Sequence, residues 1–249
     1  MLRFHLRLYP KPRFLGVTAA SYSIDHFDEV LSWAHHIGRE VPPSVDLNLM
    51  TSRNPKLIRG QGIEIAAPVF EDSWSKARSA TSFMSARPRG AKLVIPLTKV
   101  PLSRLYHQVM THYPSNTHWV SDNMWTHASY EELRPGLHRV VDTMPQRPSH
   151  MLWMNWMPPE SRPDMAYSVE DDYYISLYGG WNHPHEAAAT ARWAPDRIAE
   201  MSHLSTGSQL ADDPGHPARV IAEPNLDRLA GLRSTHDPSG RFQPWIGHA

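Results

Sequence analysis

DYYISLYGGW, residues 172–181, carries aromatic side chains on both faces of the strand that it predicts. Successive side chains of a strand point to opposite faces of the sheet. The two faces are Tyr173, Ile175, Leu177 and Trp181 on one side, and Tyr174, Ser176, Tyr178 and Gly180 on the other. Large apolar side chains on both faces must both be covered, and this requirement decides the kind of sheet that the chain builds.

Two further segments alternate in the same way and also predict strands. Residues 151–157 place Leu152, Met154 and Trp156 opposite Met151, Trp153, Asn155 and Met157. Residues 117–125 gather Trp119, Ser121, Asn123 and Trp125 on one face. These strands therefore resemble the first in mixing aromatic rings with a few polar groups.

The rest of the chain interleaves strands and helices. Alternating apolar residues predict strands at 3–8, 14–21, 45–49 and 63–69. Helical spacing predicts helices at 25–37, 102–110, 133–144, 184 onward and 225–233, with interruptions at Pro135 and Pro195. Several strands follow one another directly, which favours an α+β fold with a mostly antiparallel sheet and helices on one face.

A sheet with helices on one face leaves its other face to be covered by something else. A ligand, another domain, a second copy of the chain or simply more core would each serve. Tyrosine beside serine and asparagine favours a ligand, because binding pockets mix apolar walls with a few polar groups. We therefore expect five residues to face a ligand: Tyr174, Ser176, Tyr178, Trp156 and Asn155.

Composition excludes several classes of function. Lys plus Arg equals Asp plus Glu, at 25 each, so net charge favours neither nucleic acid nor an anionic membrane as a partner. The longest apolar runs are too short to span a bilayer, and the first residues show no secretory signal. With no Cys, the chain has no disulfide and no thiolate site. We expect a cytoplasmic protein.

Histidines and glycines supply the remaining candidates. The 16 His are scattered, and His183 and His185 flank a proline at a predicted helix start, which is poor chelating geometry. We therefore expect no metal site, and no residue stands out as catalytic. Gly179 and Gly180 lie inside a strand, where they allow a neighbouring backbone or ring to approach closely.

Six segments, in this order, resemble the berberine-bridge-enzyme-like family of FAD-linked oxidases, which are flavoproteins of the vanillyl-alcohol oxidase type. The resemblance covers nearly the whole chain and matches only the C-terminal, substrate-domain part of the family. The segments are RFHLRLYP (3–10), MLWMNW (151–156), RPDMAYS (162–168), YGGW (178–181), RLAGLR (228–233) and HDPSGRF (236–242).

The resemblance implies a substrate-binding domain at residues 1–205 and a C-terminal segment at 206–249 that docks on an FAD-binding domain. It implies oxidation of a small organic substrate by hydride transfer to FAD, most of whose site lies outside this chain. It also implies that Gln209 contacts the cofactor. Plant members place a carboxylate base where this chain has Ser176, which is a poor base at neutral pH.

Two functions from different classes remain open. The first is the substrate-binding portion of an FAD-dependent oxidoreductase, inactive without an FAD-binding domain or partner chain. The alternative is a non-catalytic binding or dimerising module that kept the fold and lost the flavin. Because an uncovered aromatic face favours association, we also expect self-association or a partner.

Overall fold

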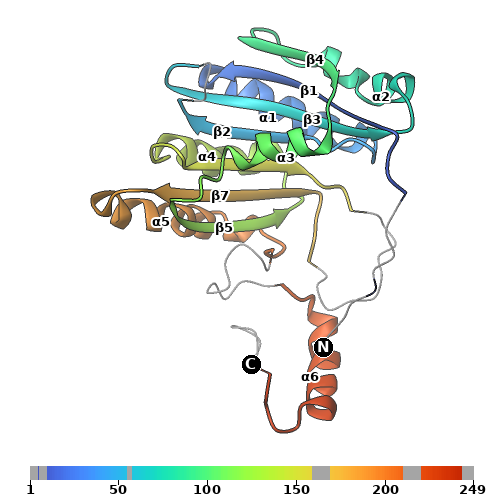
Figure 1. Cartoon of the computed structure of the whole chain (residues 1–249). Coiled ribbons are helices and arrows are strands. Elements are labelled where there is room, and N and C mark those ends of the chain that lie inside the picture. Colours follow the sequence, from blue (N-terminus) through green and yellow to red (C-terminus); the bar gives the residue numbers. More distant parts are fainter. Residues whose placement is uncertain (1–4, 6–9, 55–57, 159–168, 210–219, 243–249) are drawn as a thin grey trace.

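The computed structural model describes residues 5, 10–54, 58–158, 169–209 and 220–242. Apart from His5, the strand expected at 3–8 lies outside the described residues. The seven described strands form one sheet in the order β4-β1-β3-β2-β6-β7-β5, and each neighbouring pair is antiparallel (Figure 1). They are β1 Phe14–Ser23, β2 Asn48–Arg53, β3 Gln61–Glu71, β4 Leu93–Lys99, β5 His118–Thr126, β6 His150–Asn155 and β7 Tyr173–Trp181. The predicted α+β fold with an antiparallel sheet is confirmed.

Six α-helices accompany the strands in the described part of the chain. They are α1 Phe27–Ile37, α2 Trp74–Ala80, α3 Leu102–Met110, α4 Tyr130–Asp142, α5 Pro184–Glu200 and α6 Glu223–His236. Short 3-10 turns lie at Ile24–His26, Gly38–Glu40, Ser82–Ala86 and Ser202–Leu204. None of these helices is long and apolar enough to cross a membrane.

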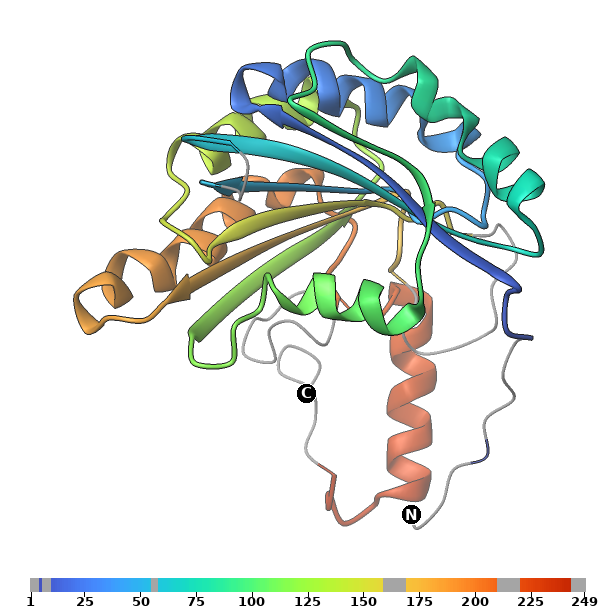
Figure 2. The same ribbon diagram turned by 45° about the horizontal axis from the view of Figure 1, so that its top comes forward.

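The helices divide between the two faces of the sheet. Figure 2 shows α1, α2, α4 and α5 on one face, which we call the helix face, and α3 on the other, which we call the open face. No residue of α3 is buried, so this helix lies over the open face without sealing it. The last helix, α6, points away from the sheet and likewise has no buried residue.

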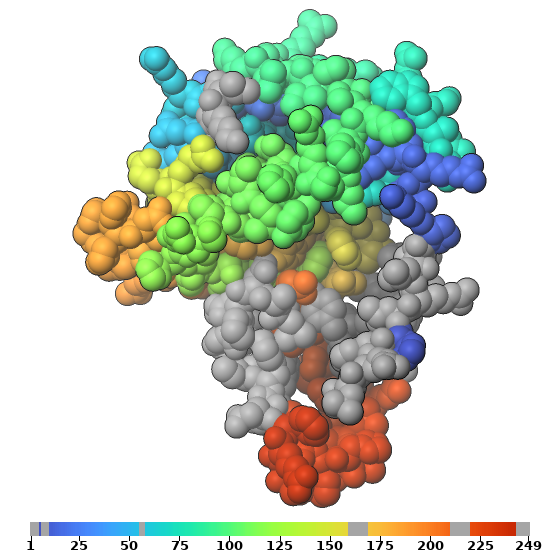
Figure 3. Space-filling view, viewed as in Figure 1, coloured from blue at the N-terminus to red at the C-terminus, as the bar shows by residue number. Residues whose placement is uncertain are grey.

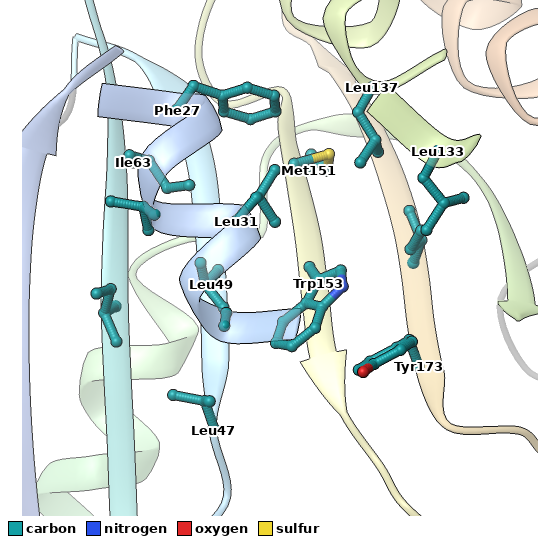
Figure 4. Close-up of a cluster of buried hydrophobic side chains, with 14 of the residues drawn as sticks. Phe27, Leu31, Leu47, Leu49, Ile63, Leu133, Leu137, Met151, Trp153 and Tyr173 are labelled. Carbon is teal, nitrogen blue, oxygen red and sulfur yellow. The ribbon is translucent and has the colours of Figure 1, made fainter. Parts of the chain in front are cut away.

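The main core fills the space between the sheet and the helix face. Figure 4 shows side chains of α1 and α4 meeting those of the central strands. Trp153 of β6 is fully buried there, together with Leu31 of α1 and Leu137 of α4. Burial of apolar surface stabilises a fold by about 25 cal/mol per Å², so this layer contributes strongly to stability.

The structure differs from the prediction at two prolines and adds two elements. Pro135 and Pro195 lie inside continuous helices α4 and α5 instead of interrupting them. Each proline removes one backbone hydrogen bond, at a cost of about 3 kcal/mol, but buried side chains on both sides of it hold the helix to the sheet. The short helix α2 and the edge strand β4 have no counterpart in the prediction, because both are largely exposed and show no regular apolar spacing.

The two edges of the sheet are protected in different ways. β4 forms one edge and carries Pro96, which lacks an N–H group that another strand could bind. β5 forms the other edge, where Gly207 pairs with Trp125 in an isolated bridge. The segment that contains Gly207 therefore extends the sheet on the side that carries the aromatic strands.

Truncation of a core side chain should destabilise the fold strongly. Leu137→Ala leaves a cavity beneath a fully buried position of α4, and we expect the free energy of unfolding to fall by about 2–5 kcal/mol. Urea denaturation followed by circular dichroism measures the change. Leu232→Ala on α6, where the side chain is 48% exposed, is the matched control and should stay within about 0.5 kcal/mol.

Acid should weaken a polar contact between α1 and α4. Burial acts to raise the pKa of Asp28, but hydrogen bonds from Arg134, Tyr130 and His138 outweigh it and hold the pKa well below 3.8. A depressed pKa stabilises the fold above pH 3.8, and this contribution is lost as the pH falls further. Asp28→Asn should cost about 1 kcal/mol at pH 7, because the carboxylate is partly exposed.

Chemical denaturation of wild type and Asp28→Asn at pH 7, 5 and 3 tests this expectation. The difference in unfolding free energy should shrink between pH 5 and 3, because near and below pH 3.8 the unfolded wild-type chain binds a proton at Asp28 that the folded protein does not yet take up. A difference that stays constant across the three pH values would show that the charge of Asp28 does not stabilise the helix pair.

Candidate ligand site on the open face of the sheet

Strand register arranges the open-face side chains in rows that run across the sheet. What we call the middle row has two polar residues at each end and two apolar side chains between them. It consists of Ser21, Glu64, Met50, Leu152, Ser176 and Asn123, taken from six neighbouring strands. With strands about 4.8 Å apart, the row spans roughly 24 Å.

Ser176 occupies an interior position of the middle row and is fully buried. Its neighbours in register are Leu152 of β6 and Asn123 of β5. At the far end of the row, Glu64 accepts a hydrogen bond from Ser21 at 3.3 Å and remains partly exposed. Met50 and Leu152, which lie between, are also only half-buried, so the row presents an accessible apolar strip with polar ends.

On one side of the middle row lies what we call the tryptophan row, Asn48, Met154, Tyr174 and Trp125. The Trp125 ring lies 4.7 Å from Tyr174 and 5.6 Å from Trp156, measured between ring centroids. Tyr174 is 6% exposed, whereas Trp156 is 45% exposed. Tyr174, Trp125, Met154 and Val169 form an apolar cluster separate from the main core.

On the other side lies what we call the histidine row, Ser52, His150, Tyr178 and Ser121. The imidazole of His150 stacks on Tyr178 with a centroid separation of 4.8 Å. Tyr113, which follows α3, contacts both rings at 5.1 and 5.3 Å. Burial lowers the pKa of His150 to about 4, so the ring is neutral at physiological pH.

A segment from the C-terminal part of the chain is attached beside these rows. The backbone of Trp125 exchanges hydrogen bonds with Thr206 and Gly207 at 2.9 and 2.8 Å. The side-chain oxygen of Asn123 accepts from the Gln209 N–H at 2.6 Å, and its amide nitrogen donates to the Gln209 carbonyl at 3.3 Å. Gln209 is thereby held at the end of the middle row.

The structure thus brings together four of the five residues expected to face a ligand. Tyr174, Ser176 and Tyr178 belong to the open-face rows, and Trp156 packs against Trp125 at their edge. Their role in binding stays a prediction.

The prediction that Asn155 faces a ligand is wrong. Asn155 lies on the helix face, where its amide donates to the carbonyl of Gly38 at 3.1 Å. The alternation of β6 places residue 155 beside Trp153, and the side chain there satisfies a backbone carbonyl at the end of α1.

The glycine pair in β7 allows the close approach of neighbouring groups that the sequence predicts. A Cβ at Gly179 would lie 2.7 Å from the backbone oxygen of Thr190 in α5. A Cβ at Gly180 would lie 2.8 Å from the Trp119 ring. The first glycine therefore lets a helix approach the sheet closely, and the second makes room for a ring on the open face.

The histidines flanking Pro184 form a helix start. His183 and His185 stack with ring centroids 5.6 Å apart, and Glu186 accepts the His183 N–H at 3.1 Å. The described ranges contain no group of three or more His, Asp or Glu side chains that could hold a metal ion.

Glu64 and His150 are two open-face residues with proton-accepting groups that were not among the predicted site residues. Glu64 follows from the alternation of Ile63 and Ile65, which places the carboxylate opposite the core. His150 precedes the predicted strand by one residue and shares the face of Leu152 by the same alternation. Strand periodicity could have found both, but the residue types alone did not indicate a site.

We compared the chain with protein-family models, curated proteins and solved structures. No protein-family model matches the chain. A curated relative, the FAD-linked oxidoreductase nodO of Hypoxylon pulicicidum, is 20% identical over 256 residues, which cover 98% of this chain and 55% of that protein. A single-residue variant of berberine bridge enzyme superposes with a TM-score of 0.72 at 11% identity, covering 97% of this chain and 56% of that one.

The chain has the fold of the C-terminal part of berberine-bridge-type flavoenzymes. Two other flavoenzymes of this fold are BBE-like 1 of Physcomitrella patens and 6-hydroxy-D-nicotine oxidase of Arthrobacter nicotinovorans, each with a TM-score of 0.71 at 11% identity. The comparisons cover 94% and 95% of this chain. The resemblance carried by the opening, middle and tail segments is confirmed.

The chain spans about half the length of the relatives that it matches. These relatives are FAD-linked oxidoreductases and oxidases. In this chain the open face of the shared fold carries the aromatic rows. Figure 3 shows α3 and the chain on either side of it, in green, lying across the middle of this face.

Removing the side chain of Asn123 should loosen the segment that carries Gln209. Asn123→Ala deletes the acceptor of the Gln209 N–H and the donor to its carbonyl, and should cost about 1–3 kcal/mol locally. Amide hydrogen exchange at Gln209 should then quicken by about tenfold. Asn48→Ala, in the tryptophan row, is the control and should leave exchange at Gln209 unchanged; equal exchange in all three proteins would contradict the role of Asn123.

Proposed function

We propose that this chain is the substrate-binding portion of an FAD-dependent oxidoreductase, in which the open face covers the flavin ring and the substrate. The observation that carries the proposal is the accessible apolar strip of the middle row, set between two aromatic rows, in a chain with this fold. The substrate would be a small organic molecule, and the flavin would supply the chemistry by accepting hydride.

The open face fits a planar ring system. Leu152, Met50 and Met154 offer half-buried apolar surface on two neighbouring strands, β2 and β6, and Trp156 adds an exposed ring at the edge. A tricyclic ring lying on this strip would bury apolar area on both partners. The polar ends of the middle row, Glu64 and Asn123, lie where they could orient a substrate.

The described rows of the open face lack the groups that usually bind the pyrophosphate of FAD. Phosphates bind at helix N-termini, glycine-rich loops or paired arginines, whereas the three open-face rows contain no Lys or Arg and their His150 is neutral. We infer that most of the cofactor is held by an FAD-binding domain or partner chain outside this sequence. Residues 206–249 would then dock on it, with Gln209 positioned near the cofactor by Asn123.

The chain's own contribution would be to bind, orient and exclude water. Tyr174 and Trp125 wall one side of the strip, and Tyr178 walls the other. The buried hydroxyl of Ser176 would orient a substrate, since it is a weak base at neutral pH. The proton released on oxidation would need another acceptor, because this chain has no carboxylate at the position of Ser176.

That absence favours a second candidate, a binding or dimerising module of the same fold that carries out no oxidation. Ser176 is the specific observation behind it. The visible spectrum separates the two when the chain is isolated from its native source together with whatever domain or partner accompanies it: a yellow assembly supports the oxidoreductase, and a colourless one supports the binding module. Self-association through the open face stays a prediction of either function.

Lumiflavin, which is the flavin ring without ribityl phosphate or adenine, should bind this chain as well as FAD does. Quenching of tryptophan fluorescence measures both affinities, and we expect dissociation constants within about threefold of each other. Leu152→Glu places a charge at the centre of the strip and should weaken both by about tenfold.

Leu232→Glu on exposed α6 is the matched control and should bind both flavins like wild type. Two results would contradict the proposal. FAD binding about 100-fold more tightly than lumiflavin would place the pyrophosphate on this chain, and unchanged binding in Leu152→Glu would place the ring elsewhere.

A further inference from the structure

One nitrogen on the open face has a hydrogen-bonding capacity that the fold leaves unused. His150 is 1% exposed, and its Nδ1 lies 2.9 Å from the carbonyl oxygen of Pro148. A carbonyl oxygen only accepts, so Nδ1 carries the proton and Nε2 presents a lone pair. Nε2 is buried and has no hydrogen-bond partner.

The position of this nitrogen is unlike that of the other unpartnered buried atoms in the described residues. Those of Trp153, Asn155 and Trp193 belong to side chains on the helix face. His150 alone among them is a member of an open-face row. A buried acceptor without a partner destabilises the fold, and a ligand with a donor group would relieve that cost.

The surroundings of Nε2 indicate what such a ligand would look like. Tyr178 stacks on the imidazole at 4.8 Å, while Tyr113 and Trp119 lie 5.1 and 6.0 Å away with their planes nearly perpendicular to it. With Nδ1 tied to the main chain at Pro148, Nε2 is the ring nitrogen that is left for a ligand. A neutral acceptor among aromatic faces selects a planar molecule with an O–H or N–H group and disfavours an anion.

The cover over His150 is lightly held. Tyr113 and Trp119 are only half-buried, and they belong to the connection between α3 and β5 and to the start of β5. No residue of α3 is buried, so the helix before Tyr113 adds little packing. A segment with so few buried contacts opens at small free-energy cost, which gives a ligand a path to Nε2.

We propose that His150 Nε2 is the specificity-determining acceptor for an aromatic ligand bearing a hydroxyl or N–H donor, which displaces Tyr113 and stacks in the histidine row. This deepens the proposed function, on which it rests in taking the open face as the ligand face. A ligand that lacks the donor would leave Nε2 buried and unpaired, so discrimination by this one contact is about fivefold to tenfold.

Phenol and anisole test the proposal, because they share one ring and differ in the donor. We expect phenol to bind the purified chain about five- to tenfold more tightly than anisole, measured by tryptophan fluorescence. In protein labelled with ¹⁵N-histidine, long-range proton–nitrogen spectra should show the Nδ1–H tautomer for His150. Phenol, and not anisole, should move the Nε2 resonance.

His150→Phe keeps an aromatic ring in the row and should bind phenol and anisole equally. His107→Phe, on exposed α3, is the matched control and should keep the preference for phenol. The proposal is overturned if wild type binds both probes alike, if it binds neither, or if His150→Phe retains the preference. Lumiflavin binding to these same variants tests the proposed flavin face separately. A failure of the His150 proposal can therefore be told apart from a failure of the proposed function.

Discussion

The burial of one face of β7 against the helices fixes the identity of the other face. Ile175 and Leu177 are fully buried beneath the helix face. Because a strand alternates its side chains, that burial obliges Tyr174, Ser176 and Tyr178 to lie on the open face, and a shift of one residue would exchange the two sets. The candidate site is therefore a consequence of core packing, transmitted across the sheet by the register of β5, β6 and β7.

The strength of this constraint explains which features the sequence could predict. The faces of β7 and the close approach at Gly179 followed from alternation and from the size of a side chain, and both are confirmed. Asn155 was misplaced because its polar character was taken as a sign of a ligand, whereas its amide satisfies the Gly38 carbonyl at the end of α1. A polar side chain gives the same signal in either role until its partner is known.

Other details depend on energies that local patterns do not contain. Pro135 lies inside α4 because Leu133 and Leu137 are buried on either side of it, and their contribution exceeds the loss of one hydrogen bond. β4 could not be predicted because it is exposed along most of its length and is specified by pairing with β1. The unpartnered nitrogen of His150 is a property of three strands and one connection together, which no short stretch of sequence encodes.

The position of Ser176 shows how burial limits the chemistry of the middle row. A serine fits a fully buried strand position because it has no charge to solvate, but its hydroxyl is a weak proton acceptor. Acceptors then remain at the margins, in the carboxylate of Glu64 and the imidazole of His150. Glu64 lies three strands from Ser176, roughly 14 Å across the sheet, whereas His150 lies one strand from Ser176 and one row along. Of the two, only the imidazole is close enough to share one small ligand with Ser176, so the geometry makes recognition of a donor group the more direct use of this face.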